Sequence, residues 1–291
     1  MATPPAEVHI DEALVGRLLR EQLPELAEAE VRVVANGWDN AVVRVGEEWM
    51  LRLPRRTAAA TLIHHEQRWL PELAPRLPLP VPVPTFVGQP ADDYPWSWSL
   101  CRWLPGRIAA ESPPADQDRA VADLAAFLRA LHVPAPADAP ANPVRGVPLR
   151  ARAAVVESRL ATPAPTVEPR RVLEVWNDLS ATPVWDGPPL WIHGDLHPAN
   201  MLTHGGELAA VIDFGDITAG DPATDLAVAW TMFDEVARHA FRTAAGVDDA
   251  TWRRAAGWAL ALALAYLTGD DESPMPAIGR RALAAVLAEV D

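Results

Sequence analysis

The first hundred residues combine helical apolar spacing with short apolar runs that are separated by turns. Apolar residues recur every three to four positions between Ile10 and Ala29, which predicts a first helix, and the stretch from Thr57 to Leu73 predicts a second. Between them lie three Val- and Leu-rich runs that predict a meander of antiparallel strands, namely EVRVVAN, NAVVRVG and EWMLRLP. Two more strands, TFVG and WSWSLCRWL, are expected after LPLPVPVP, whose alternating prolines lack the amide hydrogens that a helix needs.

The pattern changes near Leu104, after which almost every apolar stretch has helical spacing. Asp116 is a predicted N-cap, and further helices are expected near residues 146–160, 168–180, 222–240, 250–268 and 276–289. LWIHG and NMLTHGGELAAVID interrupt this series and predict a strand and then a hairpin that turns at residues 204–206. We therefore expect an α+β fold with two lobes, an antiparallel sheet over residues 1–104 and a mostly helical part over residues 105–291.

Length and composition agree with a two-lobed protein of the cytoplasm. The chain has 291 residues and 49% hydrophobic content, enough to bury a sizeable core. The opening MATPPAEVHIDEALV has neither the basic nor the apolar region of a secretory signal. The longest apolar run, Ala255 to Leu267, is shorter than the roughly 20 residues that span a bilayer, so we expect no membrane partner. Cys101 is the only cysteine, which excludes an internal disulfide and fits a reducing compartment.

The charge of the chain limits its partners. The formal net charge is -14, and all 25 basic residues are arginines, since no lysine is present. This balance argues against nucleic-acid binding through a basic patch and favours cationic partners. The abundance of Ala, Arg and Pro fits a biased gene composition equally well, so charge is supporting evidence only.

The stretch HGDLHPAN, residues 193–200, contains the most concentrated chemistry of the sequence. The predicted hairpin folds Asp213 back beside Asn200 and places Asp195 on the loop before the first hairpin strand. Phosphoryl transfer uses such a set, because one carboxylate accepts the proton of an attacking hydroxyl while carboxamide and carboxylate oxygens bind Mg²⁺. Each fragment alone is also typical of an ordinary turn or helix cap.

A zinc hydrolase is a second interpretation of the same stretch. His193, Asp195 and His197 alternate as metal ligands can, although no second histidine cluster supplies the remaining ligands. The residues alone leave both kinds of site open.

Several motifs together resemble the aminoglycoside phosphotransferase family, whose members are relatives of the eukaryotic-type protein kinases. They are WIHGDLHPANML, VIDFGDITAGDPATDLA, GWDN, WMLRLPRR followed by HHEQRWL, LPLPVPVP, WSLCRWLPGR and FLRALH, in the family's order from about residue 30 to residue 267. The resemblance implies a bilobal protein-kinase-like fold. Residues 1–104 would bind ATP or GTP with Mg²⁺, and residues 105–291 would carry the catalytic loop and the site for a small-molecule hydroxyl acceptor.

The resemblance also implies roles for individual residues of the helical lobe. Asp195 would be the catalytic base, and His193 would brace the catalytic loop. Asn200 and Asp213 would bind magnesium. Asp225, one turn into a helix, would support the loop rather than take part in the chemistry.

In the first lobe the resemblance implies a nucleotide site. Gly37 and Asn40, within NGWDN, would belong to the turn that closes over the phosphates, although NGWDN lacks the repeated glycines of a kinase loop and fits a plain hairpin turn equally well. Leu100 to Trp103 would be the hinge whose backbone meets the base.

The third strand departs from the family pattern. A kinase has a lysine there that pairs with a helix glutamate, here Glu66, but this chain has Arg52 at the corresponding position. A guanidinium can bind phosphate oxygens and still bond Glu66, although it is longer and planar. Arg44, Arg55 and Arg56 are alternative candidates, and Arg52 could also be an ordinary surface arginine of the strand. The departure leaves a non-enzymatic alternative, a nucleotide-binding pseudokinase.

The acceptor is the least determined feature of the sequence. An aminoglycoside, with its several ammonium groups, is the leading expectation and would make the protein an antibiotic-resistance kinase. The carboxylates expected to bind it are Asp234, Glu235, Asp270, Asp271 and Glu272. The 12 tryptophans also permit a macrolide, and other small metabolites remain alternatives.

Overall fold

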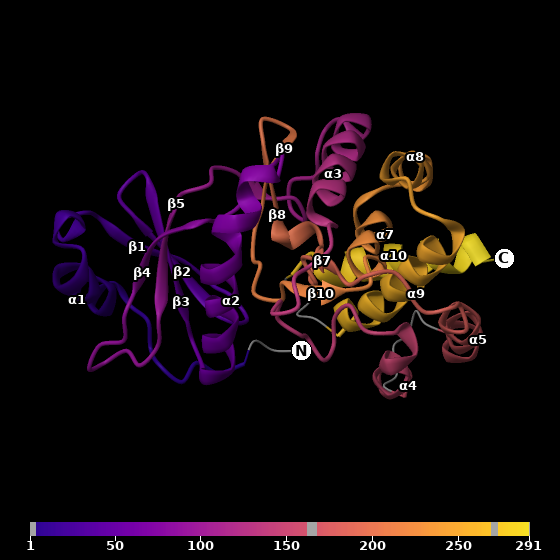
Figure 1. The fold of residues 1–291 in the computed structure, drawn as a ribbon, viewed down its shortest axis with the longest axis horizontal. Helices are drawn as coiled ribbons and strands as arrows, with labels where there is room; N and C mark the ends of the chain where they lie inside the picture. The colour runs from indigo at the N-terminus through magenta and orange to yellow at the C-terminus, as the bar shows by residue number, and fades with distance from the viewer. Residues whose placement is uncertain (1–3, 162–167, 269–272, 291) are drawn as a thin grey trace.

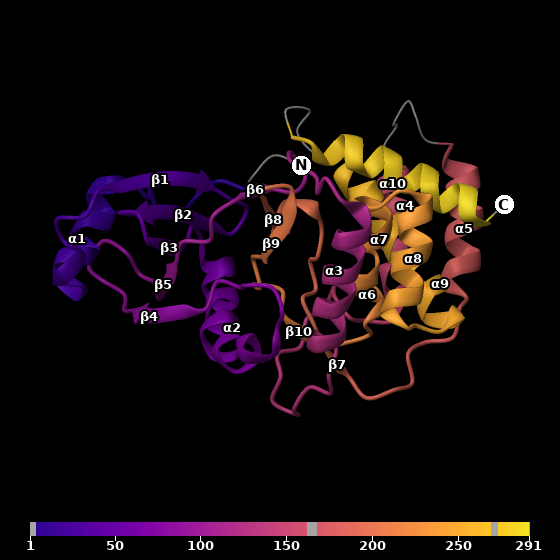
Figure 2. The ribbon, with the colours of Figure 1, turned by 90° about the horizontal axis from the view of Figure 1, so that it is seen from above.

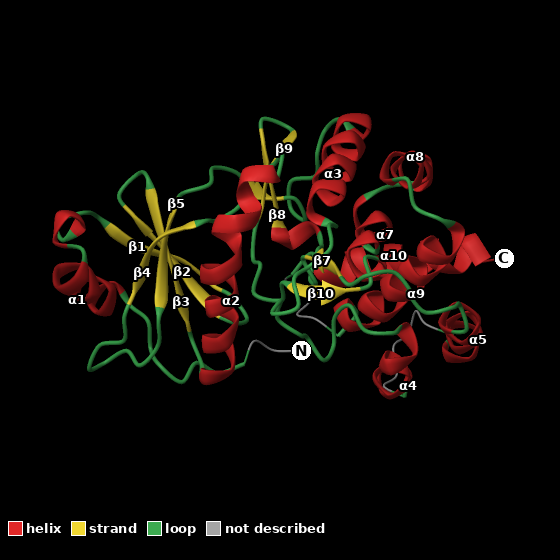
Figure 3. Ribbon diagram, in the orientation of Figure 1, coloured by secondary structure: helices red, strands yellow, loops and turns green. Residues whose placement is uncertain are grey.

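The computed structural model describes residues 4–161, 168–268 and 273–290. An antiparallel sheet lies at one end of the molecule and a bundle of helices at the other, with helix α2 between them in both views (Figures 1 and 2). Strands and helices are thus segregated (Figure 3), and the α+β architecture expected from the sequence is confirmed. Among the described residues, no helix has the length and apolar composition needed to cross a membrane.

The first sheet has five strands in the order β1-β2-β3-β5-β4. All of its neighbours are antiparallel, and its strands are the predicted ones, at β1 Val31–Asn36, β2 Asn40–Val45, β3 Trp49–Pro54, β4 Pro84–Gly88 and β5 Trp98–Arg102. Helix α2, Thr57–Leu73, has the predicted bounds. Helix α1, Glu12–Gln22, is shorter than expected, because Pro24 cannot continue it and instead begins a 3-10 turn, Pro24–Leu26.

The helical part is arranged around one helix that is buried on nearly all sides, α9, Asp249–Tyr266. It packs against α4 Ala153–Leu160, α5 Pro169–Ser180, α6 Ala223–Leu226, α7 Val228–Met232 and α10 Met275–Val290. Two further helices, α3 Gln117–Leu131 and α8 Glu235–Ala245, pack against each other. The single helix expected over residues 222–240 is wrong, because Phe233 is extended and the Asp234 side chain caps a new helix by accepting the amide of Ala237. Residues 149–152 form a 3-10 turn ahead of α4.

Two small sheets lie where the two parts meet. Strand β7, Leu190–Ile192, pairs with β10, Thr218–Gly220, and the other sheet has the order β6-β8-β9, with β6 Arg107–Ile108, β8 Met201–His204 and β9 Glu207–Val211. The β8–β9 hairpin is the predicted one. His204 pairs with Glu207, so Gly205 and Gly206 form its tight turn, and both have positive φ angles that favour glycine.

Candidate active site

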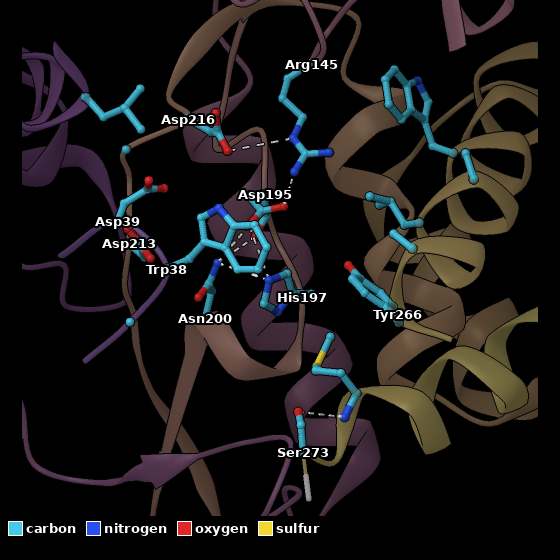
Figure 4. A pocket seen from close by; sticks show the side chains of 18 of the residues that line it. Trp38, Asp39, Arg145, Asp195, His197, Asn200, Asp213, Asp216, Tyr266 and Ser273 are labelled. Atoms are coloured by element: carbon cyan, nitrogen blue, oxygen red, sulfur yellow. Dashed lines mark hydrogen bonds and ion pairs between the residues drawn. The ribbon is translucent and has the colours of Figure 1, made fainter. Parts of the chain in front are cut away.

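The hairpin brings together the three oxygen-bearing residues that the sequence analysis singled out, Asp195, Asn200 and Asp213. Met201 pairs with Val211, and the amide of Ile212 donates to the carbonyl of Asn200 at 2.9 Å, so Asp213 lies beside Asn200. The Asn200 Nδ2 donates to the backbone oxygen of Asp195 at 2.9 Å. Asp195, Asn200 and Asp213 line one cavity of about 580 Å³. Figure 4 shows Asp195 and Asn200 in the middle of this pocket.

The loop that carries Asp195 is held by a buried carboxylate. Asp225, fully buried, accepts the backbone amides of His193 at 2.8 Å and of Gly194 at 2.9 Å, and its Oδ2 lies 3.0 Å from His132 Nε2. The His193 ring bonds the carbonyl of Ile212 at 3.0 Å. Both side chains therefore fix backbone geometry around Asp195 instead of facing the cavity.

Asp195 is paired with an arginine that the sequence did not single out. Arg145, in the proline-rich loop after α3, donates from Nη2 to Asp195 Oδ1 at 2.5 Å, and His197 Nε2 lies 3.3 Å from Oδ2. Burial alone would raise the pKa of Asp195, but the charges of Arg145 and His197 outweigh it and hold the pKa well below its ordinary value. Asp195 is therefore a carboxylate at any neutral pH. No sequence pattern identifies Arg145, because this residue reaches Asp195 from a loop that is distant in the chain.

Arg52 occupies the place of the expected lysine and makes the expected contact. Its guanidinium is 4% exposed, bonds Glu66 through Nε at 3.0 Å and Nη2 at 2.6 Å, and also donates to Asp213 Oδ1 at 2.9 Å. Burial raises the pKa of Glu66 above its ordinary value, although Arg52 opposes the shift. Asp213 has a φ of 63°, a left-handed conformation that costs energy in a residue other than glycine.

The turn between β1 and β2 forms the opposite wall of the pocket. Gly37 and Asn40 both line it, and the Gly37 amide donates to the Asn40 carbonyl at 2.9 Å. The Asn40 Oδ1 is buried without a hydrogen-bond partner in the described residues. Trp38, at the tip of the turn, is 44% exposed (Figure 4).

The hinge expected over Leu100 to Trp103 stays a prediction, and its first residue lies within a strand. Leu100 lies in the middle of β5, pairs with Leu51 on one side and Phe86 on the other, and is 4% exposed in the core of the sheet. Its backbone is therefore used by the sheet. Trp103 lies just after the strand, and its amide donates to the Glu48 carbonyl at 2.7 Å.

The residues of the zinc interpretation do not gather as ligands. The amide of Asp195 donates to His193 Nδ1 at 3.2 Å, and the other ring nitrogen bonds a carbonyl, so both nitrogens are occupied. In the part of the chain that the structure describes, no group of three His, Cys, Asp or Glu side chains is placed to hold a metal ion.

The expected acceptor-binding carboxylates lie elsewhere or are not described. Asp234 is the N-cap of α8 and Glu235 its first residue, and neither lines the pocket. Asp270, Asp271 and Glu272 fall outside the described residues.

Comparisons with known proteins place the chain in a family and identify structures with a similar fold. A family model described as the phosphotransferase enzyme family matches residues 30–258, whereas a search of curated proteins found no match. The GDP complex of aminoglycoside 2'-phosphotransferase-IIIa is similar at a TM-score of 0.70 and 20% identity, over 97% of this chain and 100% of that chain. A macrolide 2'-phosphotransferase from Brachybacterium faecium is similar at a TM-score of 0.61 and 23% identity, over 95% of this chain and 97% of that chain.

At these identities the solved structures show a shared fold, and the family model carries the assignment. It extends from β1 to the middle of α9 and includes Arg52, Asp195 and Asp213. The chain belongs to the phosphotransferase enzyme family.

Proposed function

We propose that the protein transfers the terminal phosphoryl group of ATP or GTP to a hydroxyl of a small molecule in a magnesium-dependent reaction. The observation that carries this proposal is the convergence of Asp195, Asn200 and Asp213 in one pocket, opposite the turn that contains Gly37. In the reaction, the acceptor oxygen forms a bond to the terminal phosphorus, and the bond to the leaving diphosphate oxygen breaks. The hydroxyl proton goes to Asp195, and the products are a phosphate ester and a nucleoside diphosphate.

The two expected magnesium ligands fit that ion. Asn200 uses its Nδ2 for Asp195, which leaves its Oδ1 as the available oxygen, and Asp213 uses Oδ1 for Arg52 and keeps Oδ2. Mg²⁺ in nucleotide sites takes one or two protein oxygens and completes its shell with water and phosphate oxygens. When bound, Mg²⁺ would neutralise charge that develops on the phosphates.

Asp195 fits the role of the base because of its position rather than its basicity. Arg145 keeps its carboxylate ionised, so it accepts a hydrogen bond from the acceptor hydroxyl and takes the proton late, as a loose phosphoryl-transfer transition state allows. His193 and Asp225 are positioning residues that hold the loop on which Asp195 lies.

The sheet would hold the nucleotide. Glu66 orients Arg52, whose guanidinium replaces the lysine that meets the phosphates in kinases, and Gly37 and Asn40 cover the phosphate end. Trp103 would lie beside the nucleobase of the bound nucleotide. A nucleoside triphosphate as phosphoryl donor and a single thiol, Cys101, are consistent with a cytoplasmic protein.

The experiment combines turnover with nucleotide binding. We expect a product heavier by one phosphoryl unit when the protein is incubated with ATP or GTP, Mg²⁺ and pooled hydroxylated compounds that include aminoglycosides and macrolides. D195N should keep nucleotide affinity and lose about 10²- to 10⁴-fold in kcat, the range of general-base catalysis. D186N, which changes an exposed aspartate outside the pocket, is the matched control. Nucleotide binding without any product would instead indicate a pseudokinase.

A further inference from the structure

The side of the pocket that faces the helices is lined by hydrogen-bond donors, several of them cationic. Three arginines, here called the arginine cluster, share this wall with an indole, a phenol and apolar side chains. Its members are Arg145, Arg152 and Arg159, next to Trp258, Tyr266, Ala261, Leu262 and Ala265. The carboxylates Asp39 and Asp213 lie on the opposite side, and Asp195 separates the two regions (Figure 4).

Two members of the cluster have no counter-charge among the residues that the structure describes, which leave out Asp270, Asp271 and Glu272. Arg152 ends the 3-10 turn before α4, and Arg159 lies two helical turns further on, so both face the same side. Arg159 donates from Nη1 to the carbonyl of Ala261 at 2.8 Å, which fixes the guanidinium at the cavity wall. Within residues 4–161, 168–268 and 273–290, no carboxylate forms an ion pair with Arg152 or Arg159.

The local electrostatics show the same imbalance. Burial lowers the pKa of Arg152 and of Arg159, and repulsion between members of the cluster lowers both further. Arg145 differs, because Asp195 and Asp216 outweigh the effect of burial and raise its pKa. An anion placed between Arg152 and Arg159 would relieve this repulsion.

Neutral donors beside the cluster also lack acceptors. The Nε1 of Trp258 and the hydroxyl of Tyr266 are buried without a hydrogen-bond partner in the described residues, and both residues line the pocket. A buried donor without an acceptor is destabilising, and an oxygen of a bound ligand would supply the missing acceptor. The wall therefore matches a ligand that is rich in oxygen and negatively charged.

We infer that the phosphoryl acceptor carries an anionic group, a carboxylate or a phosphate, which binds between Arg152 and Arg159 while its hydroxyl meets Asp195. This inference rests on the proposed function and narrows its substrate class. A polycationic acceptor would bring ammonium groups against guanidinium groups on this wall, and a neutral one would leave both arginines without a counter-charge.

The test uses one sugar ring with four different charges. Glucose, glucosamine, glucuronate and glucose 6-phosphate are supplied with ATP and Mg²⁺, and kcat/KM is measured from diphosphate release and product mass. We expect kcat/KM for one of the two anionic sugars to exceed that for glucose by about tenfold or more, as one charge-assisted contact provides, with glucosamine lowest. The two anions distinguish a carboxylate from a phosphate. Equal or better turnover of glucosamine would overturn the inference.

Binding separates this inference from the proposed reaction. The same four sugars are titrated, by calorimetry, into protein saturated with a non-hydrolysable ATP analogue and Mg²⁺. Anion-selective binding without turnover would uphold the acceptor class and count against phosphoryl transfer. Turnover without anion selectivity would support phosphoryl transfer and count against an anionic acceptor.

Variants of Arg152 and Arg159 test whether these two arginines cause the selectivity for anions. R152Q and R159Q should each raise KM for the preferred anion by about tenfold or more, whereas R159K should keep most of the affinity. R159E should shift preference toward glucosamine. R150Q is the matched control, because Arg150 lies on the same 3-10 turn, is exposed and does not line the pocket. An unchanged KM in both R152Q and R159Q would refute the inference.

Discussion

Replacing Arg145 by glutamine should move the acid limb of the pH–rate profile toward neutral pH. The Arg145 guanidinium lies 2.5 Å from Asp195 Oδ1, and its charge contributes most to keeping this partly buried carboxylate ionised. Once its charge is removed, the effect of burial is opposed by the neighbouring imidazoles and by the weak hydrogen bond from Asn200 Nδ2 at 3.4 Å, and the pKa of Asp195 rises.

The size of the shift follows from the geometry. Charge centres roughly 4 Å apart interact by about 4 kcal/mol at an effective dielectric constant near 20, which equals about three pKa units. Water reaches both side chains, and relaxation around the new amide compensates part of the loss, so we expect a rise of about one to two units. The sign is fixed, because a base with a higher pKa becomes protonated earlier as the pH falls.

The assay is kcat/KM for the acceptor from about pH 3 to pH 8, a range that reaches the expected acid limb of R145Q, measured for the wild type, R145Q and R145K. The lysine variant keeps a positive charge near Asp195, so its acid limb should stay closer to that of the wild type. A residual activity in R145Q is sufficient, since only the position of the limb is compared.

An acid limb of R145Q that coincides with that of the wild type would refute the reasoning. It would mean that Arg145 does not control the ionisation of Asp195, or that another group limits the rate. Asp216 is such a group, because burial raises its pKa, and D216N would then move the limb.

Three further outcomes are expected. D213A should remove the magnesium dependence of nucleotide affinity, and an unchanged dependence in fluorescence titrations would exclude that metal role. R52M should lower the free energy of unfolding, measured in urea at pH 8, by about 3–5 kcal/mol, because Glu66 is left buried and unpaired. The double variant R52M/E66L should regain most of that stability. An equal loss of stability in R52M and R52M/E66L would contradict the prediction. G194A should lower kcat by about 10²-fold, because Gly194 has a φ of 85° and a Cβ there would lie 2.4 Å from the Asp216 carbonyl oxygen. G205A is the control and should leave kcat unchanged, because a Cβ at Gly205 would meet no other atom.

The local part of the site was predictable because it depends on short-range signals. The two glycines after His204 specify a tight turn, and the alternating residues on either side specify its strands. A hairpin of this length brings its ends together regardless of the rest of the fold. The proximity of Asn200 and Asp213 was therefore expected, as were the bounds of α2 and the cap at Asp116.

Other predictions failed where the local signal was ambiguous. Residues 222–240 have continuous helical spacing, but a capping aspartate and an extended Phe233 divide them. The strand that contains Leu100 was predicted, but its place between β3 and β4 depends on a crossover that the sequence does not show. A sequence pattern does not specify strand order.

The sequence by itself determined the two lobes, the reaction class that the motifs resemble and the identity of the residues around Asp195. Only the tertiary structure placed Arg145, Arg152 and Arg159 in the same pocket, because they come from a loop, a 3-10 turn and a helix that are distant in the chain from Asp195. Periodicity and turn chemistry act over a few residues, whereas the packing of α4 on α9 decides which side chains face the cavity. The acceptor's expected charge is therefore a property of the packed fold, and no single motif contains it.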